Sequence, residues 1–291
     1  MALLGERALL IVNPASRGGR RLAQPAADAF HAAGVEVDVV LTEAPGHGGR
    51  IARELAEGYD LIFTLGGDGT AIEVVDALSG TNRAVGILPG GTGNLLSRAL
   101  GTPVDVRRAV PALLHGTRRR IDLGVLGDGR HFAVAAGAGV DATMVAGAPL
   151  AARRRYGVLA YVGSATRALI HREPFSIRAE VDGQVIERDD CVLAMIVNVG
   201  VILNGLLHLG PGTTCDDGVL DLCVYSARSF ADAAVIAGRL AIRDFRQDRL
   251  TTFARGHHIV IDTMRPIAAQ ADGELIGMTP LVADVARFNM R

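Results

Sequence analysis

The chain contains no lysine, so each of its 30 basic residues is an arginine. This absence excludes a phosphate loop of the Walker A type, which depends on a lysine directly after its glycines. Any phosphate group would therefore have to be held by arginine side chains or by backbone N–H groups. The net charge of −1 gives no electrostatic reason to expect a nucleic-acid partner, and we expect none.

Cysteine and long apolar runs are also scarce. The three cysteines, Cys191, Cys215 and Cys223, are odd in number and lack a paired metal-binding spacing, which predicts reduced thiols in a cytoplasmic protein. We expect no secretion signal at the N-terminus. The longest apolar stretch, residues 191–203, contains Asn198 and is shorter than the roughly 20 residues of a membrane-spanning helix. The positive mean hydropathy of +0.29 favours a core rich in Ala and Val, with peripheral contact at the inner face of a membrane as the alternative.

The first 120 residues alternate between short apolar runs and segments with helical periodicity. Predicted strands cover residues 9–12, 35–41, 61–65 and 84–88. Predicted helices cover residues 22–33, the surroundings of 51–55, 70–78, 94–100 and 106–114. Such alternation is typical of a doubly wound α/β domain with a parallel sheet, whose ligands bind at the carboxyl ends of the strands.

After residue 121 the pattern changes to short runs separated by hairpin turns. Gly127-Asp128-Gly129 lies between the runs 121–126 and 131–135, and Asp182-Gly183 lies between the runs 176–181 and 184–187. Asp-Gly favours a type I′ turn. Further strands are predicted over residues 191–199, 219–225, 257–261 and 280–285, and helices over 157–170 and 230–240. We therefore expect a mostly antiparallel second domain.

Three polar turns follow three of the predicted strands: Asn13-Pro14-Ala15-Ser16, Gly66-Gly67-Asp68-Gly69-Thr70 and Pro89-Gly90-Gly91-Thr92-Gly93-Asn94. Each is also compatible with an ordinary turn, and Thr92 or Asn94 with a helix cap. Together they favour one crevice where phosphate oxygens approach bare backbone N–H groups at helix N-termini. Asp68 alone would repel phosphate, so it indicates either a bridging Mg²⁺ ion or a hydroxyl that loses its proton.

These turns, with Asp216-Asp217-Gly218-Val219-Leu220-Asp221 and Asp272-Gly273-Glu274, resemble the diacylglycerol kinase catalytic family, which includes bacterial lipid kinases, sphingosine kinases and ceramide kinases. Gly66-Gly67-Asp68-Gly69-Thr70 alone is similar to NAD kinases as well, so the later motifs discriminate. The resemblance implies an α/β ATP-binding domain at 1–121, a β-sandwich lipid-acceptor domain at 122–280 and a segment, 281–291, that returns to the first domain. It also implies an ATP site in the cleft between the domains.

The resemblance implies ATP-binding residues in the first domain. They are Asn13, Pro14, Ala15, Ser16, Arg17, Thr42, Gly66, Gly67, Asp68, Gly69, Thr70, Glu73, Gly91, Thr92, Gly93 and Asn94. Arg17 departs from the family pattern, which has glycine there, so either the loop is reshaped or Arg17 adds a charge for the phosphates. Glu73 could act through Mg²⁺ or a hydroxyl, or could simply stabilise the first turn of a helix.

A structural Mg²⁺ site is implied in the second domain, with the Asp217 carboxylate and the backbone oxygens of Thr214 and Val219 as ligands. The alternative is a solvated turn. The resemblance further implies that Gly137-Ala138-Gly139-Val140-Asp141 supplies an aspartate to the active-site polar network.

The catalytic residues implied are Glu274, favoured as the proton acceptor, and Asp68, a competing base or an orienting carboxylate. The expected function is an ATP- and Mg²⁺-dependent kinase that phosphorylates a hydroxyl of diacylglycerol or a related amphipathic lipid. The alternatives are an NAD kinase-like enzyme and a non-catalytic nucleotide or lipid sensor. Arg153-Arg154-Arg155 is either solvated surface or a contact to anionic headgroups, and a homodimer is left open.

Overall fold

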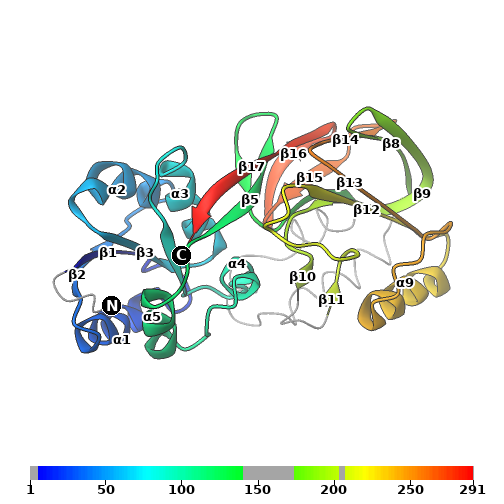
Figure 1. The fold of residues 1–291 in the computed structure, drawn as a ribbon. Helices are drawn as coiled ribbons and strands as arrows, with labels where there is room; N and C mark the ends of the chain where they lie inside the picture. The colour runs from blue at the N-terminus through cyan, green and yellow to red at the C-terminus, as the bar shows by residue number, and fades with distance from the viewer. Residues whose placement is uncertain (1–5, 140–173, 203–206, 291) are drawn as a thin grey trace. The chain divides into compact units, whose positions relative to one another are not determined.

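The computed structural model describes residues 6–139, 174–202 and 207–290 (Figure 1). Backbone contacts divide the chain into two compact units. Unit 1 contains Met1–Ile121 together with Arg287–Arg291, and unit 2 contains Asp122–Ala286. The C-terminal strand β17 (Leu281–Met290) therefore contributes to both units.

Unit 1 is built on a parallel sheet in which four strands lie in the order β4–β3–β1–β2. The strands are β1 (Arg7–Val12), β2 (Glu36–Leu41), β3 (Leu61–Gly66) and β4 (Val85–Pro89). Every residue of β3 and β4 is buried, as expected for central parallel strands that are covered on both faces. Met290 of β17 pairs in parallel with Val85 of β4, on the side of β4 that faces away from β3.

Helices cover both faces of this sheet, with α1 against α5 on one side and α2 against α3 on the other (Figure 1). The helices are α1 (Gly19–Ala32), α2 (His47–Leu55), η1 (Ala56–Gly58), α3 (Asp68–Ala77), α4 (Leu95–Ala99) and α5 (Val106–Leu114). In the core beneath α1, the rings of Phe30 and Phe63 meet edge to face with centroids 4.7 Å apart.

Unit 2 is an antiparallel sheet that curls around its own core, with the long strand β9 pairing with β7, β8 and β12. Besides most of β17, its described elements are β5 (Arg119–Leu126), which begins in unit 1, β6 (His131–Phe132), β7 (Ala135–Gly139), β8 (Phe175–Val181), β9 (Gln184–Val197), β10 (Val201–Ile202), β11 (Leu207–His208), β12 (Leu220–Ser226), α9 (Phe230–Ile242), β13 (Thr251–Gly256), β14 (His258–Thr263), β15 (Ala268–Ala271) and β16 (Glu274–Met278).

The predicted fold class, a parallel α/β domain followed by a mostly antiparallel one, is confirmed. Two local expectations were wrong. The runs at 184–187 and 191–199 belong to one strand, β9, which ends at Val197, because bulges at the β8 and β12 pairings let it continue through Asp190. The turn at 127–129 is not type I′, since in it only Gly129 has positive φ, and three residues separate the hydrogen-bonded Leu126 and Arg130.

The second Asp-Gly turn does have the predicted geometry. Asp182 and Gly183 both have positive φ, at 48° and 85°, which is the type I′ conformation. The predicted helix at 157–170 and the arginines at 153–155 lie outside the described residues.

Candidate active site

The structure brings the three polar turns of unit 1 together at the carboxyl ends of β1, β3 and β4. Gly18 N donates to Gly90 O at 2.8 Å, and Gly90 N donates to Gly66 O at 2.8 Å. Asn13 N donates to Leu65 O at 3.0 Å. Backbone hydrogen bonds therefore join all three turns into one surface.

Glycine is required where these turns cross. A Cβ atom on Gly91 would lie 2.5 Å from the Cα of Gly67, and one on Gly19 would lie 1.9 Å from Asn13 O. Both distances are far below van der Waals contact, so a side chain would push the turns apart. The glycines thus have a packing role as well as leaving the backbone accessible.

The side chains of Asn13 and Ser16 hold the first turn in shape. Asn13 Nδ2 donates to Thr70 Oγ1 at 2.9 Å, while Asn13 Oδ1 accepts from Ala15 N at 2.9 Å. Ser16 Oγ donates to Asn13 O at 2.8 Å and accepts from Gly19 N at 3.0 Å. Arg17 is exposed beside the start of α1. A phosphate at this turn would meet backbone N–H groups at a helix N-terminus with an arginine nearby.

Asp68 links the second turn to the third. Its Oδ1 accepts from Leu96 N at 2.9 Å, so this carboxylate, although it lies in α3, satisfies an N–H group at the start of α4. Burial raises the pKa of Asp68, and backbone N–H donors from Leu96 and Leu95 only partly oppose that shift. A carboxylate with raised proton affinity in a fixed orientation is suited to orient or accept a proton from a hydroxyl.

Asn94 does not cap α4 through its side chain, contrary to one of the sequence-based expectations. It adopts a left-handed backbone conformation, with φ at 50°, and its side chain turns back on its own loop. Asn94 Oδ1 accepts from Gly91 N at 2.7 Å, and Nδ2 donates to Gly91 O at 3.0 Å. Asp68 instead accepts the hydrogen bond from the N–H group at the start of α4. Thr92 and Gly93, which lie between Gly91 and Asn94, are exposed.

The side chain of Glu73 lies at the start of α2, and Thr42 lies at the end of β2. Both Glu73 carboxylate oxygens accept from the start of α2, from Gly46 N at 2.8 Å and from Gly48 N at 3.2 Å. Thr42 is buried just after β2, and its N–H donates to Val12 O at 2.8 Å. Glu73 therefore fixes the N-terminus of α2, a role distinct from stabilising its own helix.

In unit 2, Glu274 follows a turn that is anchored from a distant part of the chain. Asp272 and Gly273 have φ of 47° and 83° and form a type I′ turn between β15 and β16. The Asp272 carboxylate accepts from the N–H groups of Ala133 at 2.7 Å, Val134 at 2.8 Å and Ala135 at 3.1 Å. Glu274 itself is exposed.

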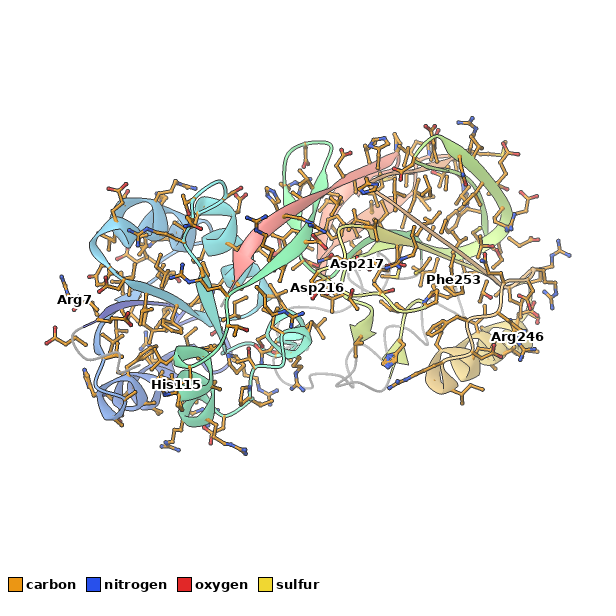
Figure 2. All side chains as sticks on the ribbon, viewed as in Figure 1. Arg7, His115, Asp216, Asp217, Arg246 and Phe253 are labelled. Atoms are coloured by element: carbon orange, nitrogen blue, oxygen red, sulfur yellow. The ribbon has the colours of Figure 1, made fainter. Side chains whose placement is uncertain are left out.

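The predicted Mg²⁺ ligands lie in the turn that precedes β12, where Figure 2 labels Asp216 and Asp217. The Asp217 carboxylate forms an ion pair with Arg255 Nη2, and its Oδ1 accepts from Val219 N at 3.3 Å. Among the described residues, no group of three or more acidic, histidine or cysteine side chains is arranged to hold a metal ion. A cation at Asp217 would therefore have to compete with Arg255.

Two residues around this turn had escaped the sequence analysis. Asp122 is buried, and its Oδ2 accepts from Gly218 N at 2.6 Å. Arg255 also lies 2.9 Å from Asp221 Oδ1, whose carboxyl pKa is raised by burial. Neither residue belongs to a recognisable motif, because the partners are separated by 34 to 96 positions in the chain and meet only in the folded structure.

Only part of the segment Gly137-Ala138-Gly139-Val140-Asp141 lies within the described residues. Gly137 and Gly139 lie in β7, and Gly139 has φ of 110°. A Cβ atom there would lie 2.5 Å from Val192 O, so glycine allows the close pairing of β7 with β9. Asp141 lies outside the described residues.

Comparison with known proteins matches both units to known domain families. Residues 7–126 match the model of the diacylglycerol kinase catalytic domain, and residues 134–289 match that of the YegS C-terminal NAD kinase beta sandwich-like domain. The chain is 28% identical to a diacylglycerol kinase of Bacillus subtilis over 94% of this chain and 92% of that protein. It is 26% identical to the diacylglycerol kinase of Staphylococcus saprophyticus over 94% and 91%, respectively.

A solved structure gives the same result. The crystal structure of a candidate diacylglycerol kinase from Bacillus anthracis str. Sterne superposes with a TM-score of 0.81 at 27% sequence identity. The match covers 98% of this chain and 94% of that chain. These relatives support a kinase with the two-domain architecture described above. The chain belongs to the diacylglycerol kinase catalytic-domain family, with a second domain of the YegS C-terminal type.

Proposed function

We propose that the protein is an ATP- and Mg²⁺-dependent lipid kinase that phosphorylates a hydroxyl of diacylglycerol or a related amphipathic lipid. The observation that carries the proposal is the joined surface of three turns in unit 1, on which Asp68 lies among backbone N–H groups. Family membership supports the same chemistry. Bound ATP would supply the phosphoryl group, and Mg²⁺ would neutralise charge on its phosphates.

The turns of unit 1 would bind and orient the nucleotide. The N-termini of α1 and α3 favour negative charge, and a Cβ atom on Gly69 would meet nothing within 4 Å, so phosphate oxygens could approach the backbone there. Arg17 is exposed next to α1 and would add the positive charge that a lysine supplies in other phosphate loops. This arrangement needs no lysine, which agrees with the composition of the chain.

Glu274 would accept the proton of the lipid hydroxyl, and Asp68 would orient that hydroxyl or the metal-bound phosphate. Glu274 is exposed directly after a turn that three N–H groups hold through Asp272, so its backbone is fixed and its carboxylate is accessible, within electrostatic reach of Arg130. Asp68 is already engaged by Leu96 N, which favours an orienting role. Its raised pKa keeps it as the alternative base.

Transfer of labelled γ-phosphate from ATP tests the proposal. The acceptors are diacylglycerols, sphingoid bases, ceramide and NAD, each with and without Mg²⁺. We expect label in a lipid product, and a loss of about 100-fold or more in Glu274→Gln because a general base contributes at least that factor. Glu187→Gln, an exposed glutamate on β9, is the matched control and should retain activity.

Asp68→Asn should lose turnover to a similar extent, with Asp76→Asn in the same helix as its control. Label in NAD instead of lipid would support the NAD kinase alternative. ATP binding without transfer to any acceptor would support a sensor. Near-normal turnover in Glu274→Gln with loss in Asp68→Asn would move the base to Asp68.

The structural Mg²⁺ site at Thr214, Asp217 and Val219 is a separate part of the proposal. Mg²⁺ would replace Arg255 as the partner of the Asp217 carboxylate, so binding should be weak and should stabilise unit 2. We expect MgCl₂ without nucleotide to raise the Tm of the wild-type protein. The rise should disappear in Asp217→Asn and persist in the neighbouring control Asp216→Asn; equal shifts in both variants would exclude this site.

A further inference from the structure

The outward face of α9 consists only of apolar residues. Phe230 is 58% exposed, Val235 45% and Ile242 76%. The alanines and the glycine that lie between them on the same face are exposed as well. The helix lies at the periphery of unit 2 (Figure 1), and its exposed residues follow one another at helical spacing.

The charged residues of α9 are turned away from this face. Asp232 is buried, accepts from Ser229 N at 3.2 Å and forms an ion pair with Arg249 at 2.7 Å. Arg239 forms an ion pair with Asp248 at 2.9 Å, with only 14% of its side chain exposed. A surface helix ordinarily directs its polar residues to solvent and its apolar residues inward, so α9 lacks the polar face that water would favour.

Positive charge flanks the apolar face. Residues 228–249 contain five arginines and three aspartates, although the whole chain has a net charge of −1. Arg228 lies directly before the helix cap, and Arg243 and Arg246 follow its last turn. All three are exposed, and Figure 2 shows Arg246 beside α9. Arg228 and Arg246 also form ion pairs with Asp190 and Asp244, so an anionic headgroup would share these two arginines with the aspartates. An apolar helix face with arginines at its ends is complementary to the boundary between acyl chains and anionic headgroups.

We propose that α9 docks unit 2 on an anionic lipid bilayer, with Phe230, Val235 and Ile242 among the acyl chains and the flanking arginines on headgroup phosphates. The helix would lie in the plane of the surface, since at 13 residues it is too short to span a bilayer. Among the described helices none is long and apolar enough to do so. The docking proposal rests on the proposed function, because a lipid kinase finds its acceptor in a bilayer.

A second copy of the chain fits this face less well. A helix of 13 residues is about 20 Å long and about 10 Å wide, so its footprint is about 200 Å². A stable interface covers about 800 Å² per partner. Symmetric pairing of two such helices would also bring flanking arginines near one another, whereas anionic lipid neutralises them.

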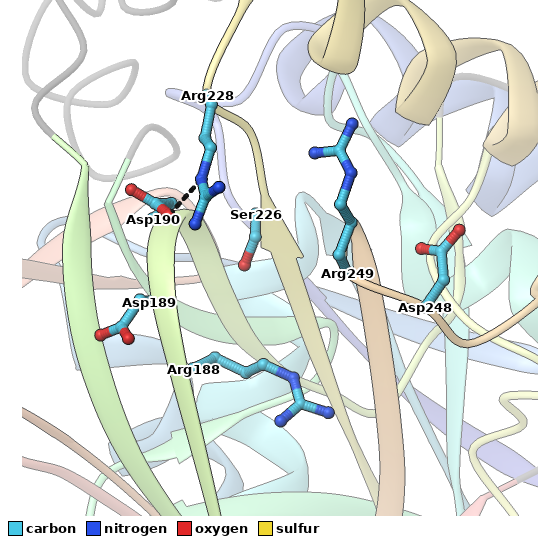
Figure 3. A pocket seen from close by; sticks show the side chains of 7 residues that line it. All are labelled: Arg188, Asp189, Asp190, Ser226, Arg228, Asp248 and Arg249. Atoms are coloured by element: carbon cyan, nitrogen blue, oxygen red, sulfur yellow. Dashed lines mark hydrogen bonds and ion pairs between the residues drawn. The ribbon is translucent and has the colours of Figure 1, made fainter.

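A cavity of about 450 Å³ next to the start of α9 does not provide an alternative anion site (Figure 3). It is lined by Arg188, Asp189, Asp190, Ser226, Arg228, Asp248 and Arg249. Three aspartates balance its three arginines, and Arg228 forms an ion pair with Asp190 at 2.6 Å. The apolar face of α9, rather than this cavity, is therefore the feature that could bind a membrane.

Cosedimentation of the full chain with vesicles tests the proposal without ATP. The vesicles contain phosphatidylcholine alone or with phosphatidylglycerol. We expect clear binding only with the anionic lipid, and a decrease of at least about tenfold in the partition coefficient of Phe230→Gln/Ile242→Gln, because two apolar side chains lose their burial. Val104→Gln/Met264→Gln, at positions 58% and 92% exposed, is the control and should bind as the wild type.

Arg243→Gln tests the charge separately. It should weaken binding to anionic vesicles by about fivefold, whereas Arg107→Gln in α5 should have no effect. Absent wild-type binding, or unchanged binding in the double variant, would overturn the proposal. So would a wild-type dimer that the same variant converts to monomer.

A kinase assay with short-chain diacylglycerol in detergent separates this proposal from the proposed function. The α9 variants should keep wild-type turnover there, since the acceptor no longer needs a bilayer. Vesicle binding without any kinase activity would overturn the proposed function alone. Kinase activity without vesicle binding would overturn the docking proposal alone.

Discussion

In unit 1 the candidate residues are held mainly by contacts inside each turn or between consecutive βα turns, whereas in unit 2 they are held by distant segments. Asn13 bonds to Ala15, two positions away, and Asn94 to Gly91, three positions away. By contrast, Asp272 bonds to Ala133, 139 positions away. Short motifs therefore reveal the turns of unit 1 and the contacts inside them, although Asn13 also bonds to Thr70 and Asp68 to Leu96 across the chain. In unit 2 a motif reveals a residue without revealing its support.

In unit 1, we expect the largest effect from Gly91→Ala. The new Cβ would lie 2.5 Å from the Cα of Gly67, and backbone cannot move aside as a flexible side chain can. We expect a decrease of about 1–3 kcal/mol in the free energy of unfolding, as for other overpacked sites. ATP affinity should fall by at least about tenfold, since the turns separate.

Urea unfolding and ATP titration measure both effects. Gly58→Ala is the control, because a Cβ there meets nothing within 4 Å. Unchanged ATP affinity in a destabilised Gly91→Ala would mean that the joined turns do not form the nucleotide site.

For unit 2, Asp272→Asn removes the charge that three N–H groups share while retaining a residue that tolerates left-handed φ. One amide NH₂ would then face an N–H donor, so we expect a loss of about 1–3 kcal/mol in stability. Turnover should fall as well, because Glu274 follows this turn directly.

Asp182→Asn provides the matched comparison. Asp182 occupies the same position of the other type I′ turn, and its carboxylate accepts from His257 N at 3.0 Å and His258 N at 2.9 Å. Its loss should affect stability alone. If both variants kept full turnover under conditions where they are folded, Asp272 would have only a structural role.

The smallest expected effect concerns the stability of unit 1 as a function of pH. The pKa of Asp68 is raised in the folded state, so the native protein binds its proton more tightly than the unfolded chain. This contribution is fully present below the unfolded pKa near 3.8 and is lost as pH rises through the folded value. Near neutral pH the buried charge therefore lowers stability.

The free energy of unfolding of Asp68→Asn, relative to that of the wild type, should therefore be higher at pH 7 than at pH 4. The variant should still lose turnover. Urea unfolding at both pH values measures the difference. A wild-type advantage that grows with pH would contradict a raised pKa.

Much of the architecture was predictable. Helix α5 has the predicted bounds, 106–114, because its apolar periodicity follows a good cap at Asp105 and precedes a polar turn. The strands β1, β3 and β4 are nearly as predicted because central parallel strands are continuous apolar runs. Strand β9 was divided wrongly, since the polar residues at 188–190 were interpreted as a break, whereas bulges let the strand continue through them.

The sequence by itself determined the alternation of strands and helices and the three polar turns, because periodicity and glycine-rich turns are local properties of a chain. Asp68 and Glu274 were proposed as catalytic residues through the family resemblance. Only the tertiary structure decided that Asp68 satisfies the start of α4, that Glu73 fixes α2 and that Asp272 is held by residues 133–135. It also decided which face of α9 is exposed. A hydrogen bond between residues far apart in the sequence depends on how the strands pair, and the local sequence does not specify that pairing.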